Sequence, residues 1–213
     1  MGSIKQGILG GFSGKVGTVI GFVRNGIAFM RGLTLSHSDA NTPAQQEQRA
    51  KFSLVVKFLR PLTTLLRMGF KTAGSRLSGF NAAMSYTMEN ALTGIYPALE
   101  IDYTKVLICR GNLPGALNPA VASAVAGQVN FTWENNAWDA SANAADKVVL
   151  AVYNPAKQKA VYVIGDATRA DGSQIVELPE LFSDDNVQCY LGFTNATQSE
   201  FSNGEFVDAV VVL

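Results

Sequence analysis

The chain has 213 residues, a formal net charge of zero, 47% hydrophobic residues and only 16% charged residues. The length is sufficient for one or two domains with a buried core. In typical soluble domains about a quarter of the residues are charged. The lower fraction here favours a chain that covers part of its surface with partners. No apolar run approaches the ~20 residues of a membrane-spanning helix. The cysteines Cys109 and Cys189 lie far apart with no Cys/His cluster, which excludes a zinc site and favours buried free thiols.

The first residues do not match a secretory signal, because Lys15 interrupts the apolar run and no small-residue cleavage site follows. We therefore expect a protein that is cytoplasmic when synthesised. Release from the cell, or an extracellular location, is expected only as part of an assembly.

The charges are distributed unevenly along the chain. Residues 1–80 hold eleven Lys/Arg and two acids, whereas residues 81–213 hold six Lys/Arg and fifteen Asp/Glu. A basic half is compatible with nucleic-acid binding and also with docking on an acidic half, in the same chain or in a neighbour. Docking is favoured, because the first 80 residues show no interleaving of aromatic and basic residues of the kind found in single-strand binding platforms.

Residues 1–35 form a predicted glycine-rich β-hairpin segment. Nine of the twenty glycines lie in residues 1–32. Lys15–Val23 and Ile27–Arg31 are predicted strands, and Asn25-Gly26 between them is a strong hairpin signal, since the tight turn needs positive φ at both central residues.

Neither face of this predicted hairpin is polar. One face would carry Val16, Thr18, Ile20 and Phe22, and the other Gly17, Val19, Gly21 and Val23. A two-stranded hairpin is marginal in water, so it should pack on the rest of the chain or on another subunit, and the glycines would admit a close backbone or helix. The predicted assembly interface comprises Val16, Gly17, Thr18, Val19, Ile20, Gly21, Phe22, Val23, Ile27 and Phe29.

Residues 42–95 form a predicted helical segment. Thr42-Pro43-Ala44-Gln45 combines an N-cap residue, proline at the first helical position and glutamine at the third. A stripe at helical spacing follows, and Pro61 should end or kink the helix. A second set of leucines ends near Gly69, and a further helix is predicted at Phe80–Leu92.

Residues 103–213 form a predicted seven-stranded antiparallel β-sandwich, so the overall fold class is α+β. Alternation is clean in several of the strands, and Asp171-Gly172 and Asn203-Gly204 mark turns. The strand candidates are Lys105–Cys109, Gln128–Trp133, Lys147–Tyr153, Ala160–Ile164, Gln174–Leu178, Val187–Phe193 and Phe206–Leu213.

This segment resembles a fibronectin type III domain. Trp133, in "FTWENN", stands where the family has the core tryptophan of its second strand, and Leu178-Pro179-x-Leu181 matches the approach to its sixth strand. Val187 occupies the position of the family's corner tyrosine. The resemblance implies an immunoglobulin-like sandwich topology.

The whole chain also resembles an uncharacterised bacterial family. Its members share a glycine-rich "G-I-x-G-x-F-S-G-K-V-G-T-V" stretch, here Gly7–Val19, and a "T-P-A-Q-x-x-Q-R-x-K-F" helix start, here Thr42–Phe52. The resemblance covers nearly all of the sequence and implies an architecture without an activity.

Motifs for catalysis or nucleotide binding are incomplete. Gly14-Lys15 matches part of a phosphate-binding loop motif, but Val16 replaces the Ser/Thr and Leu9 replaces the first glycine. His37 is the only histidine and falls in a Ser/Asp-rich linker beside Ser38 and Asp39, where a rigid triad is not expected. Acids of the C-terminal half could pair as glycosidase carboxylates or bind Ca²⁺, but solvated turns are the simpler interpretation: Asp166, Asp171, Glu177, Glu180, Asp184 and Asp185.

Three functional hypotheses follow. The first is a non-enzymatic structural subunit without cofactor or metal, which forms a homo-oligomer (a filament, a phage-like particle or an injection-type assembly) and displays the sandwich outward. The second is a nucleic-acid-associated protein that uses the basic half. The third is a glycan- or protein-binding sandwich, for which an outward Tyr190 could join three other aromatic residues on one face: Trp138, Tyr153 and Tyr162.

Overall fold

The computed structural model divides the chain into two compact units, Met1–Thr42 and Pro43–Leu213, which are considered separately. The predicted helical segment and the predicted sandwich both lie in the second unit. The structure describes residues 3–4, 10–24, 26–34, 36, 41–71, 77–139 and 141–213.

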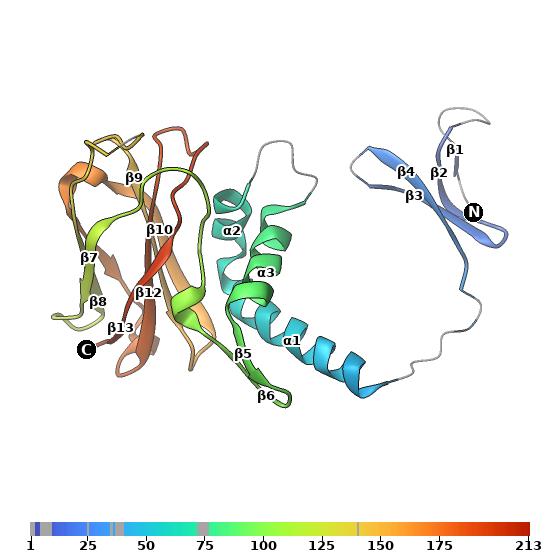
Figure 1. The fold of residues 1–213 in the computed structure, drawn as a ribbon, viewed down its shortest axis with the longest axis horizontal. Coiled ribbons are helices and arrows are strands. Elements are labelled where there is room, and N and C mark those ends of the chain that lie inside the picture. The colour runs from blue at the N-terminus through green and yellow to red at the C-terminus, as the bar shows by residue number, and fades with distance from the viewer. Residues whose placement is uncertain are drawn as a thin grey trace. The chain divides into compact units, whose positions relative to one another are not determined.

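The first unit is an antiparallel sheet in chain order (Figure 1). Gly26, at φ +77°, lies in the short connection between the last two strands, and Asn25 beside it falls outside the described residues. The hairpin predicted around Asn25-Gly26 is therefore present. The strands are β1 (Ser3–Ile4), β2 (Phe12–Val16), β3 (Val19–Arg24) and β4 (Ile27–Gly32).

The prediction of one continuous strand over Lys15–Val23 is wrong. Val16 pairs with Val19 across a turn at Gly17 and Thr18, and Gly17 has φ +56°, which favours glycine. The turn separates β2 from β3 and changes the alternation, so the predicted composition of the two faces is also wrong.

The second unit begins with a helical layer. The first helix starts at Pro43, as the sequence predicts, because proline's fixed φ suits the first helical turn. Pro61 lies in a 3₁₀ turn that ends this helix, and the side chain of Ser78 caps the third helix by accepting a hydrogen bond from the Asn81 N–H at 3.3 Å. The elements are α1 (Pro43–Leu59), η1 (Arg60–Leu62), α2 (Thr63–Gly69) and α3 (Gly79–Asn90).

A small hairpin links the helices to the sandwich: β5 (Leu92–Ile95) and β6 (Ala98–Ile101). The strand predicted at Lys105–Cys109 is wrong. The 3₁₀ turn η2 (Tyr103–Lys105), at whose start the Asp102 carboxylate accepts a hydrogen bond from the Thr104 N–H at 3.1 Å, ends at Lys105, and residues 106–109 form neither strand nor helix.

The strand that replaces it is β7 (Leu117–Ala122), which the sequence analysis missed. Pro119 lies inside it, and Asn118 has φ +47° at a register shift between Leu117 and Ala120. Proline and a register shift both interrupt the regular pattern by which a strand is predicted. An edge strand tolerates them, because one of its sides forms no ladder hydrogen bonds.

Seven strands form two antiparallel sheets, of order β10-β9-β12-β13 and β11-β8-β7. Two 3₁₀ turns, η3 (Arg169–Asp171) and η4 (Glu180–Phe182), lie between strands. The remaining strands are β8 (Gln128–Glu134), β9 (Lys147–Asn154), β10 (Lys159–Thr168), β11 (Ser173–Glu177), β12 (Asn186–Thr194) and β13 (Glu205–Val211).

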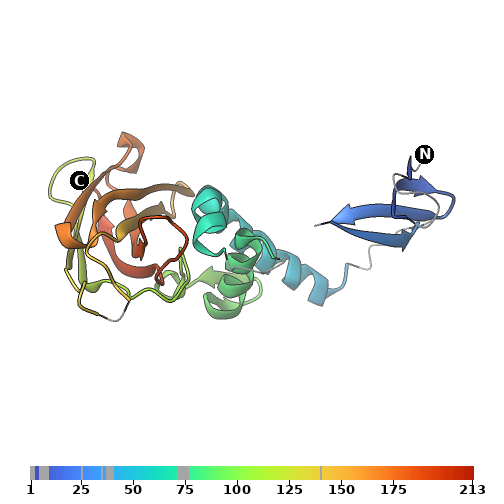
Figure 2. The same cartoon turned by 90° about the horizontal axis from the view of Figure 1, so that it is seen from above.

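The four-stranded sheet is covered on both faces. One face packs on the three-stranded sheet, where Trp133 contacts Phe193 edge to face at 5.8 Å between ring centroids. The other face packs on the helices, where the ring centroids of Phe58 in α1 and Tyr153 in β9 lie 4.7 Å apart. Figure 2 shows the teal and green helices beside this sheet. The second unit therefore has three layers and two hydrophobic cores.

The alternation within a sandwich predicts that Tyr190 faces outward, and this prediction is wrong. Tyr190 is fully buried against the helical layer. Its hydroxyl donates a hydrogen bond to the carbonyl of Tyr103 at 3.0 Å. The prediction failed because the helices cover the sheet face that a free sandwich would expose to water.

Candidate functional site

Almost none of the described residues of the first unit is buried. Gly21 is the only buried one among them, and no described residue before Val55 belongs to either core. Large apolar side chains are exposed instead, with Met30 at 72%, Val23 at 58% and Val16 at 52% of their full exposure. A sheet of this size needs a covered face for independent stability, so this unit is the strongest candidate for an interaction surface.

The register divides the unit into two faces, because successive strand residues point to opposite sides. Val16 pairs with Val19, and Gly21 pairs with Met30, so these residues share one side. We call it the glycine face. It comprises Phe12, Gly14, Val16, Val19, Gly21, Val23, Ala28, Met30 and Gly32.

The chain's own backbone crosses part of the glycine face. A Cβ on Gly21 would collide with the carbonyl oxygen of Phe12 and lie 2.6 Å from its ring, and a Cβ on Gly11 would collide with the Ala28 side chain. The glycines thus permit the close backbone approach that the sequence predicts, and the approaching segment is the start of β2. Val16, Val23 and Met30 remain exposed beside this crossing.

The opposite side is different in chemistry, and we call it the basic–aromatic face. Phe22 pairs directly with Phe29, and their rings stack at 5.6 Å between centroids with an interplanar angle of 19°. Both rings stay partly exposed, at 38% and 43%. The face comprises Lys15, Ile20, Phe22, Arg24, Ile27, Phe29 and Arg31.

The predicted interface residues are thus distributed over three places. Val16, Val19, Gly21 and Val23 lie on the glycine face, and Gly17 and Thr18 form the turn between β2 and β3. Ile20, Phe22, Ile27 and Phe29 lie on the basic–aromatic face.

The basic residues of this face were missed as site residues. The sequence contains a signal for them, since Phe22-Val23-Arg24 and Phe29-Met30-Arg31 are two Phe-x-Arg repeats. Period-2 spacing places each pair on one side of its strand. The prediction that residues 1–80 lack interleaved aromatic and basic residues is therefore wrong for this sheet.

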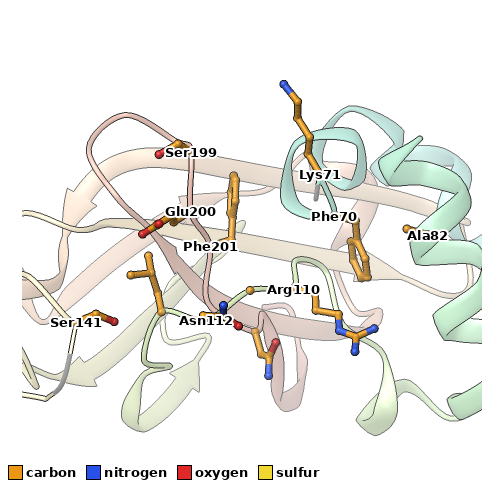
Figure 3. A pocket seen from close by; sticks show the side chains of 12 residues that line it. Phe70, Lys71, Ala82, Arg110, Asn112, Ser141, Ser199, Glu200 and Phe201 are labelled. Carbon is orange, nitrogen blue, oxygen red and sulfur yellow. The ribbon is translucent and has the colours of Figure 1, made fainter. Parts of the chain in front are cut away.

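The second unit holds a pocket of about 880 Å³ beside α2, α3 and the β12–β13 connection (Figure 3). Its lining includes Lys71, Arg110 and Glu200, together with several amides and hydroxyls. The Arg110 guanidinium lies 5.4 Å from the centre of the Tyr86 ring. Among the described lining residues the charged and polar side chains predominate, so the lining suits a polar ligand.

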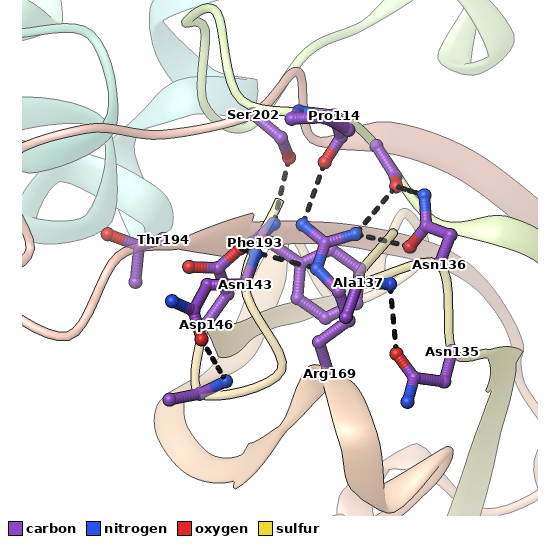
Figure 4. A network of polar contacts seen from close by, with 12 residues as sticks. Pro114, Asn135, Asn136, Ala137, Asn143, Asp146, Arg169, Phe193, Thr194 and Ser202 are labelled. Atoms are coloured by element: carbon purple, nitrogen blue, oxygen red, sulfur yellow. Dashed lines mark hydrogen bonds and ion pairs between the residues drawn. The ribbon is translucent and has the colours of Figure 1, made fainter. Parts of the chain in front are cut away.

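A buried polar cluster centres on Arg169 (Figure 4). Its guanidinium donates from Nε to Asp146 at 3.3 Å, from Nη1 to Asn136 at 2.5 Å and to the Gly115 carbonyl at 3.0 Å, and from Nη2 to the Pro114 carbonyl at 2.9 Å. It also lies 3.9 Å from the centre of the Phe193 ring.

Burial lowers the pKa of Arg169, and the carboxylate of Asp146 opposes this change. Since the guanidinium is fully buried and bonded to protein groups from Nε and both terminal nitrogens, the cluster joins loops around the sandwich and is a structural element.

The remaining candidate groups lie in separate environments. The Asp171 carboxylate accepts hydrogen bonds from the Thr168 N–H at 2.7 Å and hydroxyl at 2.8 Å, and these bonds lower its pKa. Asp185 accepts a hydrogen bond from the Asn154 side-chain amide at 2.8 Å. Within the described ranges, no group of three or more His, Cys, Asp or Glu could hold a metal ion. His37 lies outside the described residues.

Both thiols are buried and free, and burial raises the pKa of Cys109 and of Cys189 to about 12. The aromatic face suggested for the sandwich is not assembled. Trp138 is 79% exposed on a loop, whereas Tyr153 and Tyr190 belong to the core under the helices. No helix in the described part of the chain has the length and apolarity to cross a membrane.

Comparison with known proteins gives a family and a distant structural likeness. No curated protein matches the chain. The fn3 domain of human collagen alpha-1(XX) chain, solved in solution, is similar to it with 13% sequence identity and a TM-score of 0.35, over 46% of this chain and 85% of that one. The expected membership in a family of unknown function that spans most of the chain is confirmed. The chain belongs to the family of unknown function DUF6266, whose model matches residues 11–208.

Proposed function

We propose that the protein is a structural subunit that associates with copies of itself through its N-terminal unit, with the second unit as the displayed body. The observation that carries the proposal is the near absence of a core in the first unit, where only Gly21 is buried among the described residues. An apolar sheet that is left open to water gains free energy when another surface covers it.

The free edge of the sheet supports a second copy as that surface. Strand β4 stands last in the order β1-β2-β3-β4, and no strand in the described ranges pairs with its outer side. It is six residues long and carries Arg31 as its one charged side chain. A long apolar edge is a template for pairing with another strand. An edge-to-edge contact that does not close on itself produces open filaments.

The test is the mass of the full-length protein, measured by light scattering after size exclusion over a range of concentrations. We expect the mass to increase with concentration, and negative-stain electron microscopy to show particles or filaments. Met30→Glu should weaken the association at least about tenfold, because it buries an unpaired charge in the contact. A monomer mass at every concentration would refute the proposal.

Trp138→Glu is the matched control, since it places the same charge at a similarly exposed apolar position in the second unit. We expect it to leave the association unchanged. If both variants lost self-association equally, the added charge would act through general repulsion. The proposed contact through the N-terminal unit would then be refuted.

A further inference from the structure

The basic–aromatic face repeats one small pattern twice. Phe22 and Arg24 lie two residues apart on β3, and Phe29 and Arg31 lie two residues apart on β4. Since Phe22 is directly opposite Phe29 and the strands are antiparallel, the two arginines lie at opposite ends of the ring pair. Two residues along a strand span roughly 6.6 Å, so an aromatic centre is flanked by a cation on each side.

A third cation extends this arrangement at one end. Lys15 of β2 pairs with Ile20 of β3, which pairs in turn with Arg31 of β4. Lys15 and Arg31 thus stand on either side of Ile20 in one row across the sheet. The rows of the face run in the order cationic, aromatic, cationic.

Nothing in the described part of this unit neutralises these charges. The sequence contains no Asp or Glu before Asp39. All three basic residues are exposed, and none forms an ion pair with a described carboxylate. Uncompensated cations beside exposed rings favour an anionic partner, and a partner with flat aromatic groups would use both parts of the face.

We propose that the basic–aromatic face binds single-stranded nucleic acid. The phosphates would contact Lys15, Arg24 and Arg31, and an unpaired base would stack on the exposed aromatic surface of Phe22 and Phe29. Stacking of bases on aromatic side chains, next to a positively charged track for the backbone, is how proteins bind single strands without sequence preference. A duplex hides its base faces and would engage the cations alone.

This inference goes beyond the self-association proposed above. That association uses the free edge of β4 and Met30 on the glycine face, which leaves the basic–aromatic face open. The two proposals can therefore fail separately, because one is tested by mass and the other by oligonucleotide binding.

The test is fluorescence anisotropy of the full-length protein with labelled oligothymidylate and oligouridylate of about 16 nucleotides. Three phosphate contacts predict a slope of about −2 for log affinity against log salt concentration, at about −0.7 per contact. Arg24→Gln and Arg31→Gln should each reduce the steepness of this slope by about 0.7. Phe22→Leu with Phe29→Leu should weaken binding about tenfold and leave the slope unchanged, because it removes stacking and no charge.

Two matched controls isolate the face. Trp138→Leu removes an exposed aromatic side chain from the second unit, and Arg60→Gln removes an exposed cation from it. Both variants should bind like the wild type. The arginine variants retain the apolar residues of the sheet, so they test the proposal even if the double leucine variant misfolds.

Three results would overturn the proposal. The first is no binding of either oligonucleotide at about 50 mM salt. The second is binding to duplex DNA that equals single-strand binding and is unaffected by the leucine variants. The third is binding to vesicles of anionic lipid, or to an acidic polypeptide, without binding to the oligonucleotides.

Discussion

The two units of this protein form strands in the same way but bury them differently. Strands β3 and β4 pair over six residues each, as regularly as the strands of the sandwich. In the second unit, however, every residue of β9 from Val148 to Asn154 is buried, whereas in the first unit Gly21 alone is buried among the described residues. Ladder hydrogen bonds give a sheet its form, but the net stability comes mainly from burial.

The difference also holds for charge. In the second unit the buried guanidinium of Arg169 is held by a carboxylate, an amide oxygen and two carbonyls. In the first unit, Lys15, Arg24 and Arg31 are exposed and have no described carboxylate partner. A cation that is fully satisfied within the protein stabilises the fold, while an exposed and uncompensated one is available to a ligand.

The largest expected effect comes from breaking the Arg169 cluster. Arg169→Met should lower the free energy of unfolding of the second unit by about 3–5 kcal/mol, because it leaves the buried Asp146 carboxylate without its counter-charge. Urea unfolding followed by tryptophan fluorescence would measure it. Lys157→Met is the control, since Lys157 forms only a surface ion pair of 4.0 Å with Asp185, and a loss below about 1 kcal/mol is expected. Equal losses in the two variants would contradict a structural role for the cluster.

Phenylalanine truncation compares the two units directly. Phe58→Ala should cost about 3–5 kcal/mol, because Phe58 is 2% exposed and packs against Tyr153 between the helices and the sheet. Phe29→Ala, at a residue 43% exposed in the first unit, should change the same unfolding transition by less than about 0.5 kcal/mol. A large loss from Phe29→Ala in the monomeric protein would show that the two units unfold together.

A third expected effect is a decrease of stability at alkaline pH. Burial raises the pKa of Cys109 and Cys189 to about 12, whereas an unfolded thiol has a pKa of about 8.5. Between these values the unfolded state loses protons that the folded state keeps, so stability falls as pH rises, by about 2 kcal/mol per thiol at pH 10.

Unfolding at pH 8 and pH 10 would measure this decrease, and a Cys109→Ala, Cys189→Ala variant should lack the thiol contribution. The native thiols should also resist alkylation at pH 8 until denaturant is added. Rapid alkylation of the native protein would contradict their burial. The first unit contains no Cys, so the thiol contribution belongs to the second unit alone.

Local signals predicted much of the fold. Pro43 marked the start of α1, the Asn25-Gly26 step marked the β3–β4 hairpin, and alternation around Trp133 placed β8 with this residue inward. Each of these signals acts within a few residues through fixed φ, positive φ or side-chain period. These predictions agree with the structure because the local conformations do not depend on contacts with distant residues.

Three of the failures share a cause in contacts between distant segments. Tyr190 was expected to face outward, and it is buried because helices from another part of the chain cover its side of the sheet. Strand β7 was missed; it contains Pro119, which an edge position accepts because the tertiary arrangement leaves one side of the strand unpaired. The basic–aromatic face was missed because Lys15, Phe22 and Arg31 come together only through strand pairing.

By itself, the sequence determined the order of most elements, an apolar N-terminal sheet without acidic residues, and membership in a family that spans most of the chain. Backbone propensity, side-chain period and composition are properties of short segments, so they can be read without a structure. Only the tertiary structure decided which faces are covered. Burial depends on contacts between residues far apart in sequence. Such contacts form two cores in the second unit, whereas the described faces of the first unit remain exposed.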